Sequence, residues 1–240
     1  MTDKQKDLDK YRNEIDEIDD EIHQLLLNRT TLAHKISEAK GNSKGTNTGL
    51  AIRPSREAFI LRRLKKNHHG DFPFASLARM WREMINAFTL LQSHYELAVY
   101  TKSNDMRCWE VARDQFGSIV KMHAFDTPEK AVQHAEENNH IIAIVPQNGL
   151  FYTHNTNVIL RLPFSGECHS MHTHYDVYAI AQLSSQNSGN DTTIFREINS
   201  VTPSDAEEII RNGDTVIYTK KGFDTNGIGV YPNGIEETHG

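Results

Sequence analysis

The first third of the chain has the hydrophobic period of helices. From about Lys6 to Lys40 apolar residues recur at alternating steps of three and four, which predicts one long helix with a single buried stripe. A helix of that length is expected to pack against a partner along much of itself. A second helix is expected from Pro54 until Gly70 stops it, and a third over residues 71–95.

The predicted third helix has one apolar face. Six residues form it at helical spacing: Leu77, Met80, Trp81, Met84, Ile85 and Phe88. Three helices with so long a first member cannot close a compact core alone. A homodimer with interlocked helices is therefore expected.

At Tyr95 the period changes from that of helices to that of strands. Three strands separated by two helices are predicted, at residues 95–101, 108–117, 118–125, 128–139 and 141–147. This alternation favours a parallel sheet with crossover helices. Five further strands are expected at residues 157–164, 176–183, 193–198, 215–219 and 227–232, with one helix at residues 204–213 and a polar linker at residues 184–191.

These elements predict an α+β chain with two parts, an all-α three-helix domain over residues 1–95 and an α/β domain over residues 96–240. A chain of 240 residues with 38% hydrophobic and 24% charged residues is long enough for both. No apolar run approaches the roughly 20 residues of a membrane span, and the polar N-terminus resembles no targeting signal. Two cysteines, Cys108 and Cys168, offer no disulfide framework, so a cytoplasmic location is expected.

Charge is divided unevenly between the two parts. Residues 1–95 carry 16 Lys and Arg against 13 Asp and Glu, a balance of +3, and the remainder carries 10 against 19, a balance of −9. The cation-rich first part suits a small anionic ligand. The excess is too small to indicate nucleic acid, and neither nucleic acid nor a membrane is expected as a partner.

Four polar residues fall on the predicted apolar stripes. Arg29 and Lys40 lie on the first helix, eleven residues apart and so within about 20° of one direction. Glu57 and Gln92 face inward from the second and third helices. Each alone is more simply explained by pairing with a neighbour or by reaching to solvent. Together, two cations, a carboxylate and an amide suit a small dianion that bears a hydroxyl.

Residues 8–92 resemble the all-helical (type II) chorismate mutases. The matching pieces are "LDKYRNEIDEIDDEIHQLLLNR", "AHKISEAKG", "RPSREAFILRRL" and "LARMWREMINAFTLLQ". The resemblance implies an isomerase that converts chorismate to prephenate by a Claisen rearrangement in the biosynthesis of phenylalanine and tyrosine. It implies an intertwined homodimer with shared active sites, and neither metal nor cofactor.

The resemblance also implies roles for five residues. Arg12 and Arg29 match the two arginines that hold the substrate carboxylates, with Arg12 supplied by the partner subunit. Lys40 and Gln92 match the pair that hydrogen-bonds the ether oxygen, and Glu57 matches the carboxylate on the ring hydroxyl. The reaction moves no proton and forms no covalent intermediate. The enzyme must therefore hold a compact substrate shape and stabilise charge growing on the ether oxygen.

Two positions depart from the family pattern and keep other functions open. Arg53 stands where the family commonly has Asp, and Phe88 where it commonly has a small hydroxyl residue. The alternatives are an isochorismate-pyruvate lyase of the same fold, or a regulatory protein that binds chorismate or another aromatic metabolite without turnover.

Residues 96–200 look similar to the first part of prephenate dehydratase. The stretch "ARDQFGSIVKMHAFDTPEKAVQHAEENNHIIAIVPQNG" carries the likeness, which then fails at "VPQNG" and at Thr193 to Phe195, where the dehydratase has Glu-Asn-Ser and Thr-Arg-Phe signatures. This part is therefore expected to be non-catalytic, with a binding or structural role. The segment "CHSMHTH" (Cys168–His174) is interpreted as a solvated His-rich loop, since its spacing matches no metal motif.

Overall fold

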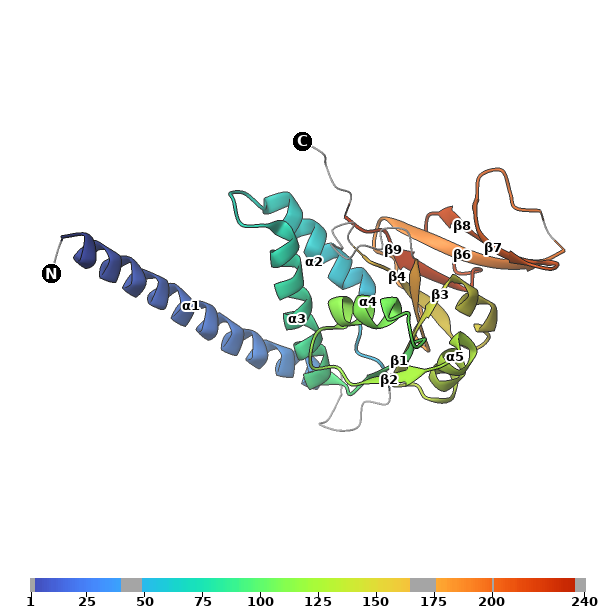
Figure 1. Ribbon diagram of the computed structural model, residues 1–240, viewed down its shortest axis with the longest axis horizontal. Coiled ribbons are helices and arrows are strands. Elements are labelled where there is room, and N and C mark those ends of the chain that lie inside the picture. The colour runs from blue at the N-terminus through green and yellow to red at the C-terminus, as the bar shows by residue number, and fades with distance from the viewer. Residues whose placement is uncertain (1–2, 40–48, 165–175, 200, 236–240) are drawn as a thin grey trace. The chain divides into compact units, whose positions relative to one another are not determined.

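The computed structural model describes residues 3–39, 49–164, 176–199 and 201–235 (Figure 1). All three predicted N-terminal helices are present: α1 (Asp3–Ala39), α2 (Pro54–Asn67) and α3 (Phe74–Gln92). Pro54 opens α2 in its first turn, where a missing backbone N–H costs nothing. No described helix is apolar enough over a sufficient length to cross a membrane.

The predicted strand–helix–strand alternation after Tyr95 is also correct. The elements are β1 (Glu96–Tyr100), α4 (Arg107–Phe116), β2 (Met122–Phe125), α5 (Pro128–Glu137) and β3 (Ile141–Pro146). β1 pairs with β2 and β3, both in parallel. Thr127 caps α5 by accepting a hydrogen bond from the Lys130 backbone N–H at 3.3 Å.

The chain then continues through mostly antiparallel strands. They are preceded by the 3₁₀ helix η1 (Gln147–Tyr152) and comprise β4 (Asn157–Leu162), β5 (Val177–Ala181), β6 (Asp191–Ile198), β7 (Glu207–Asn212), β8 (Thr215–Lys221) and β9 (Gly229–Pro232). In the described residues these strands join the first three in one nine-stranded sheet with the order β2-β1-β3-β5-β4-β9-β6-β8-β7.

The helix predicted over residues 204–213 is wrong. Residues 207–212 instead form β7, which pairs antiparallel with β8 across a tight turn in which Asn212 faces Thr215. Gly213 lies in that turn with a φ of 56°, a conformation that glycine adopts at little cost. The "NG" dipeptide between two apolar runs is a strong hairpin signal. Pairing with β8 outweighs the helical propensity of the Glu and Ile residues.

Contacts divide the chain into two units, residues 1–47 and residues 48–240. The described part of the first unit is the helix α1. In the second unit α2 and α3 share an apolar core with β1 and β3, so they fold with the sheet. The predicted division into domains at residues 95 and 96 stays a prediction.

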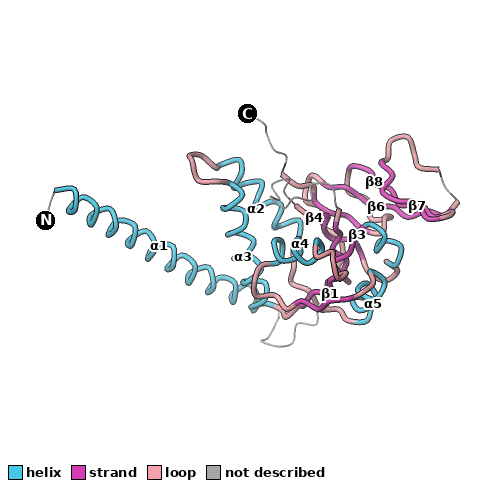
Figure 2. Tube along the Cα trace, in the orientation of Figure 1, coloured by secondary structure: helices cyan, strands magenta, loops and turns pink. Residues whose placement is uncertain are grey.

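In the second unit different helices cover the two faces of the sheet (Figure 2). Leu97 and Ile144 point to the face that α2, α3 and α4 cover, while Ala98 and Ala143 point to the face that α5 covers. The alternation follows from the two-residue period of strands. It places α4 beside the two helices on which Glu57 and Gln92 lie.

The buried face of α3 is not the predicted apolar one. Its buried residues are Phe74, Ala78, Arg82, Asn86 and Thr89. Met80, from the predicted face, is 55% exposed, and the other members of that face are only half-buried. The helix therefore buries the side that carries Arg82, Asn86 and Thr89 most deeply, while Leu77 and Trp81 of the predicted face pack only partly against the core.

Candidate functional site

Arg12 and Arg29 both lie on α1 in the first unit. The side chain of Arg12 is 64% exposed, and its nearest acidic partner is Asp9, 3.5 Å away on the same helix. Seventeen residues of helix separate the two arginines by about 25 Å along the axis. One small molecule therefore cannot contact both side chains of a single chain.

Glu57 lies on α2 in the second unit, and only 8% of it is exposed. Its Oε1 atom accepts a hydrogen bond from Gln115 Nε2 of α4 at 2.7 Å. The Arg82 guanidinium of α3 approaches the same oxygen, with Nε at 3.8 Å. The predicted inward position of Glu57 is thus what the structure shows, and three helices meet at its carboxylate.

Further hydrogen bonds connect the two partners of this carboxylate to Asn86 and Tyr95 in the core. Asn86 donates from Nδ2 to the backbone oxygens of Arg82 at 2.8 Å and Gln115 at 2.9 Å. The Tyr95 hydroxyl donates to Asn86 Oδ1 at 2.8 Å. We call Glu57, Arg82, Asn86, Tyr95 and Gln115 the Glu57 network.

Sequence reasoning missed Arg82, Asn86 and Gln115. A signal existed for the first two, because they continue the spacing of Phe74 and Ala78 along one side of α3. Apolar residues at the neighbouring positions gave a stronger pattern, and that pattern indicated the other face. Gln115 had no such signal, since its partner lies 58 residues away in the sequence.

The electrostatics of the network are set by burial. Burial raises the pKa of the Glu57 carboxyl, while the charge of Arg82 and the hydrogen bond from Gln115 act in the opposite direction. Burial, together with the charges of Glu57 and Glu83, also raises the pKa of Tyr95 well above its ordinary value. Tyr95 therefore stays a neutral donor, as its bond to Asn86 requires.

Gln92 closes α3 in the second unit and is half-buried. Its Nε2 atom donates to the backbone oxygen of Phe88, one turn earlier, at 3.2 Å. Lys40 and the His-rich segment Cys168–His174 lie outside the described residues. Because Arg12 and Arg29 belong to one unit and Glu57 and Gln92 to the other, their union in one cavity stays a prediction.

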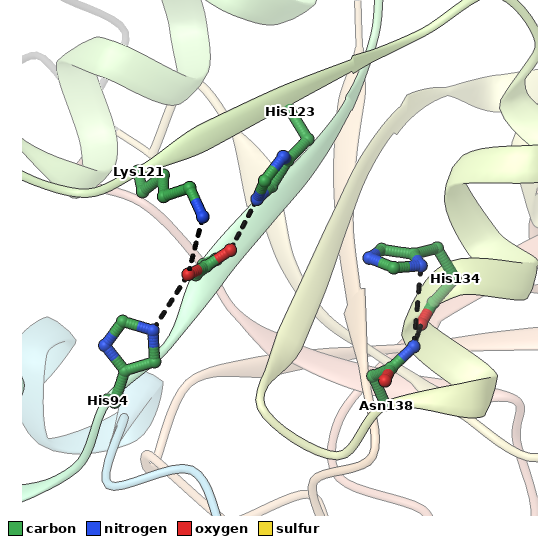
Figure 3. A network of polar contacts seen from close by, with 6 residues as sticks. His94, Lys121, His123, His134 and Asn138 are labelled. Atoms are coloured by element: carbon green, nitrogen blue, oxygen red, sulfur yellow. Dashed lines mark hydrogen bonds and ion pairs between the residues drawn. The ribbon is translucent and has the colours of Figure 1, made fainter.

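A second polar network surrounds Glu96 at the start of β1 (Figure 3). Its carboxylate contacts the ring of His123 on β2, His94 Nε2 at 2.9 Å and Lys121 Nζ at 3.2 Å. The His123 bond is the largest cause that lowers the pKa of Glu96, to about 2. These contacts tie the edge strand β2 to β1 and to the end of α3, which is a structural role.

A cleft of about 860 Å³ lies beside β4, β6, β8 and β9. Arg161 in its wall forms a bidentate ion pair with Asp176, at 2.8 and 3.0 Å, and Lys220 pairs with Asp205 at 3.0 Å. Since these charges are already neutralised by each other, the cleft presents little net charge to a ligand.

Residues 11–93 match the family model "Chorismate mutase type II". These residues are therefore similar to a type II chorismate mutase domain, as the sequence predicted. The match includes α2, α3 and most of α1.

Two relatives are described as "Bifunctional chorismate mutase/prephenate dehydratase". The one from Neisseria gonorrhoeae is 31% identical over 136 residues, which cover 57% of this chain and 36% of the relative. The one from Aquifex aeolicus is 38% identical over 95 residues, which cover 39% of this chain and 26% of the relative. The chain thus matches about a third or less of the length of these relatives.

A solved structure described as "GqqA- a novel type of quorum quenching acylases" is also similar, with a TM-score of 0.39 and 11% identity, over 57% of this chain and 95% of the other.

Proposed function

We propose that this protein is a chorismate mutase, which isomerises chorismate to prephenate. The observation that carries the proposal is the match of residues 11–93 to the type II chorismate mutase family. The buried Glu57 carboxylate adds physical support, because an anionic acceptor held in a protein interior suits a substrate hydroxyl. In this proposal Arg12 and Arg29 hold the two carboxylates of chorismate, and Glu57 accepts the hydrogen bond of its ring hydroxyl.

Lys40 and Gln92 are proposed to stabilise the ether oxygen as its bond to carbon breaks. The ether C–O bond breaks while a new C–C bond forms in one concerted step, so neither a base nor a nucleophile is needed. A preorganised ammonium and amide in a water-poor cavity stabilise the developing negative charge. One well-placed donor of this kind contributes roughly 3–4 kcal/mol to lowering the barrier.

The proposed active form is a homodimer whose helices interlock. The large apolar side chains along α1, from Leu8 to Ile36, are exposed in the single chain, as is Met80 on α3. So much apolar surface on one long helix is typical of a protein interface. The separation of about 25 Å between Arg12 and Arg29 fits this arrangement, because Arg12 then serves the partner's cavity.

Lys40→Met tests the proposed chemistry. The change keeps the apolar stem and removes the cation, so we expect turnover to fall at least about a hundredfold while chorismate binding changes less. The measurement is the loss of chorismate absorbance, with prephenate identified as the product and helix content checked by circular dichroism. Turnover within a few-fold of the parent protein would make Lys40 a structural residue.

Subunit mixing tests the shared site. Arg12→Ala and Gln92→Ala are each expected to be inactive, yet a mixed dimer would assemble one cavity with both groups intact. Activity should therefore recover in part after the two variants exchange subunits. Absence of recovery, with exchange demonstrated by differently labelled subunits, would contradict delivery of Arg12 in trans.

Arg53 and Phe88 favour two further candidates that the same assay separates. Salicylate and pyruvate formed from isochorismate would identify a lyase. Chorismate binding without prephenate formation would identify a regulatory or binding protein. We further propose a cytoplasmic location and a non-catalytic role for residues 96–240, on the two-cysteine composition and the departures from the dehydratase signatures.

A further inference from the structure

Glu57 has its closest polar contact with a residue outside the matched mutase domain. Gln115 belongs to α4, beyond residue 93, and only 3% of it is exposed. Its Nε2 atom donates to Glu57 Oε1 at 2.7 Å. A hydrogen bond between two buried side chains, one of them a carboxylate, fixes the rotamers of both.

Gln115 is itself held firmly in place. Its backbone oxygen accepts a hydrogen bond from Asn86 Nδ2 at 2.9 Å. The next residue, Phe116, is fully buried and packs edge-on against the Tyr95 ring, with 6.4 Å between ring centroids. The side-chain amide of Gln115 therefore points at Glu57 from a rigid part of α4.

The two nearest polar partners of Glu57 both contact the same carboxylate oxygen. Gln115 Nε2 and Arg82 Nε approach Oε1, and among the described residues no hydrogen bond goes to Oε2. A carboxylate has lone pairs for about four hydrogen bonds. Holding one oxygen orients the whole group and leaves the other to accept a hydroxyl.

We propose that Gln115 is a positioning residue for the mutase reaction, which orients the Glu57 carboxylate so that Oε2 accepts the ring hydroxyl of the substrate. This rests on the proposed function. It gives α4, and through it the α/β region, a part in the mutase site. Gln115 acts only through Glu57 and does not itself touch the substrate.

A pH profile separates positioning from a merely structural contribution. Among the described residues, the charged or titratable groups that face Glu57 are Arg82 from α3 and, through Asn86, Tyr95 before β1. Burial raises the pKa of Glu57, and the Gln115 bond counteracts this. Loss of that bond should raise the pKa of Glu57 further. As the pH is lowered, activity that needs an ionised Glu57 should therefore be lost at a higher pH than in the parent protein.

The experiment compares Gln115→Met with Phe116→Leu in the full chain. Methionine fills the space of glutamine without its donor, whereas Phe116→Leu loosens the adjacent core and leaves the Glu57 contact intact. We expect Gln115→Met to lower kcat/KM at pH 7 by about tenfold or more and to move the acid limb of the profile upward. Phe116→Leu should lower the melting temperature and keep the position of the acid limb.

The outcomes separate this inference from the proposed function. An inactive parent protein would overturn the proposed function itself. An active parent that loses activity in Glu57→Gln, but keeps its rate and pH profile in Gln115→Met, would overturn the positioning role alone. A slower Gln115→Met variant with the acid limb unmoved would show that Gln115 contributes only stability, which also overturns it.

Discussion

The helix α1 and the second unit differ in how far their apolar side chains are exposed. Along α1 the large apolar side chains are exposed, and Leu25 is 65% exposed. In the second unit the apolar residues of β1 and β3 are almost completely buried. The stripe of α1 follows the period of a helix and β1 and β3 are continuous apolar runs, so both sets were readable from sequence. The difference teaches that an apolar pattern in the sequence identifies an element that is suited to burial, but not the chain that will bury it.

The largest expected effect comes from charging the α1 stripe. Ile18→Asp combined with Ile22→Asp places two carboxylates where the proposed dimer buries apolar surface, at a cost of several kcal/mol. We expect a monomer in which the proposed mutase activity has fallen at least about a hundredfold. Sedimentation and the chorismate assay measure the two effects.

A matched variant controls for added charge on the same helix. Gln24→Asp with Thr31→Asp adds the same two charges on the opposite side of α1, and should leave a dimer of parent activity. A dimer that survives Ile18→Asp and Ile22→Asp would show that the stripe is not the interface.

A smaller effect is expected in the core of the second unit. Ile144 on β3 is fully buried, so Ile144→Ala should lower the free energy of unfolding by about 3 kcal/mol through lost burial and a residual cavity. Leu25→Ala on α1 should change stability little when both are measured by denaturant unfolding in the monomeric background. Equal effects at the two positions would mean that α1 is buried within its own chain.

The smallest effect concerns the Glu96 network and its dependence on pH. The pKa of Glu96 in the folded protein is about 2, below the ordinary 4.5. Its stabilising contribution is therefore complete above about pH 4.5 and is lost as the pH falls toward 2. Glu96→Gln should be less stable than the parent by about 1 kcal/mol at pH 7, the size of a partly exposed ion network.

Unfolding by urea at pH 7 and near pH 2 checks this sign. The difference between Glu96→Gln and the parent should shrink at the lower pH, while Glu137→Gln on the surface of α5 should behave as the parent does at both. A difference that stays constant, or grows toward pH 2, would show that the network does not stabilise the ionised carboxylate.

The α-helical and parallel βαβ elements could be predicted because their signals are local. The 3.6-residue period of α1, the Pro54 start of α2 and the alternation of strand and helix after Tyr95 all lie within short windows. The inward position of Glu57 was equally local. By contrast, β7 was mistaken for a helix, because "EEIIRN" is compatible with both states until β8 pairs with it.

The sequence by itself determined the helical period, the alternation of strand and helix in the first βαβ units, and the motifs that resemble those of chorismate mutases. Only the tertiary structure decided which face of α3 is buried and what surrounds the Glu57 carboxylate. The physical reason is sequence separation. Gln115 meets Glu57 across 58 residues, and the polar side of α3 is buried because α4 supplies partners for Asn86 and Glu57. A buried polar group is stable only with its partners, and those partners are chosen by the fold.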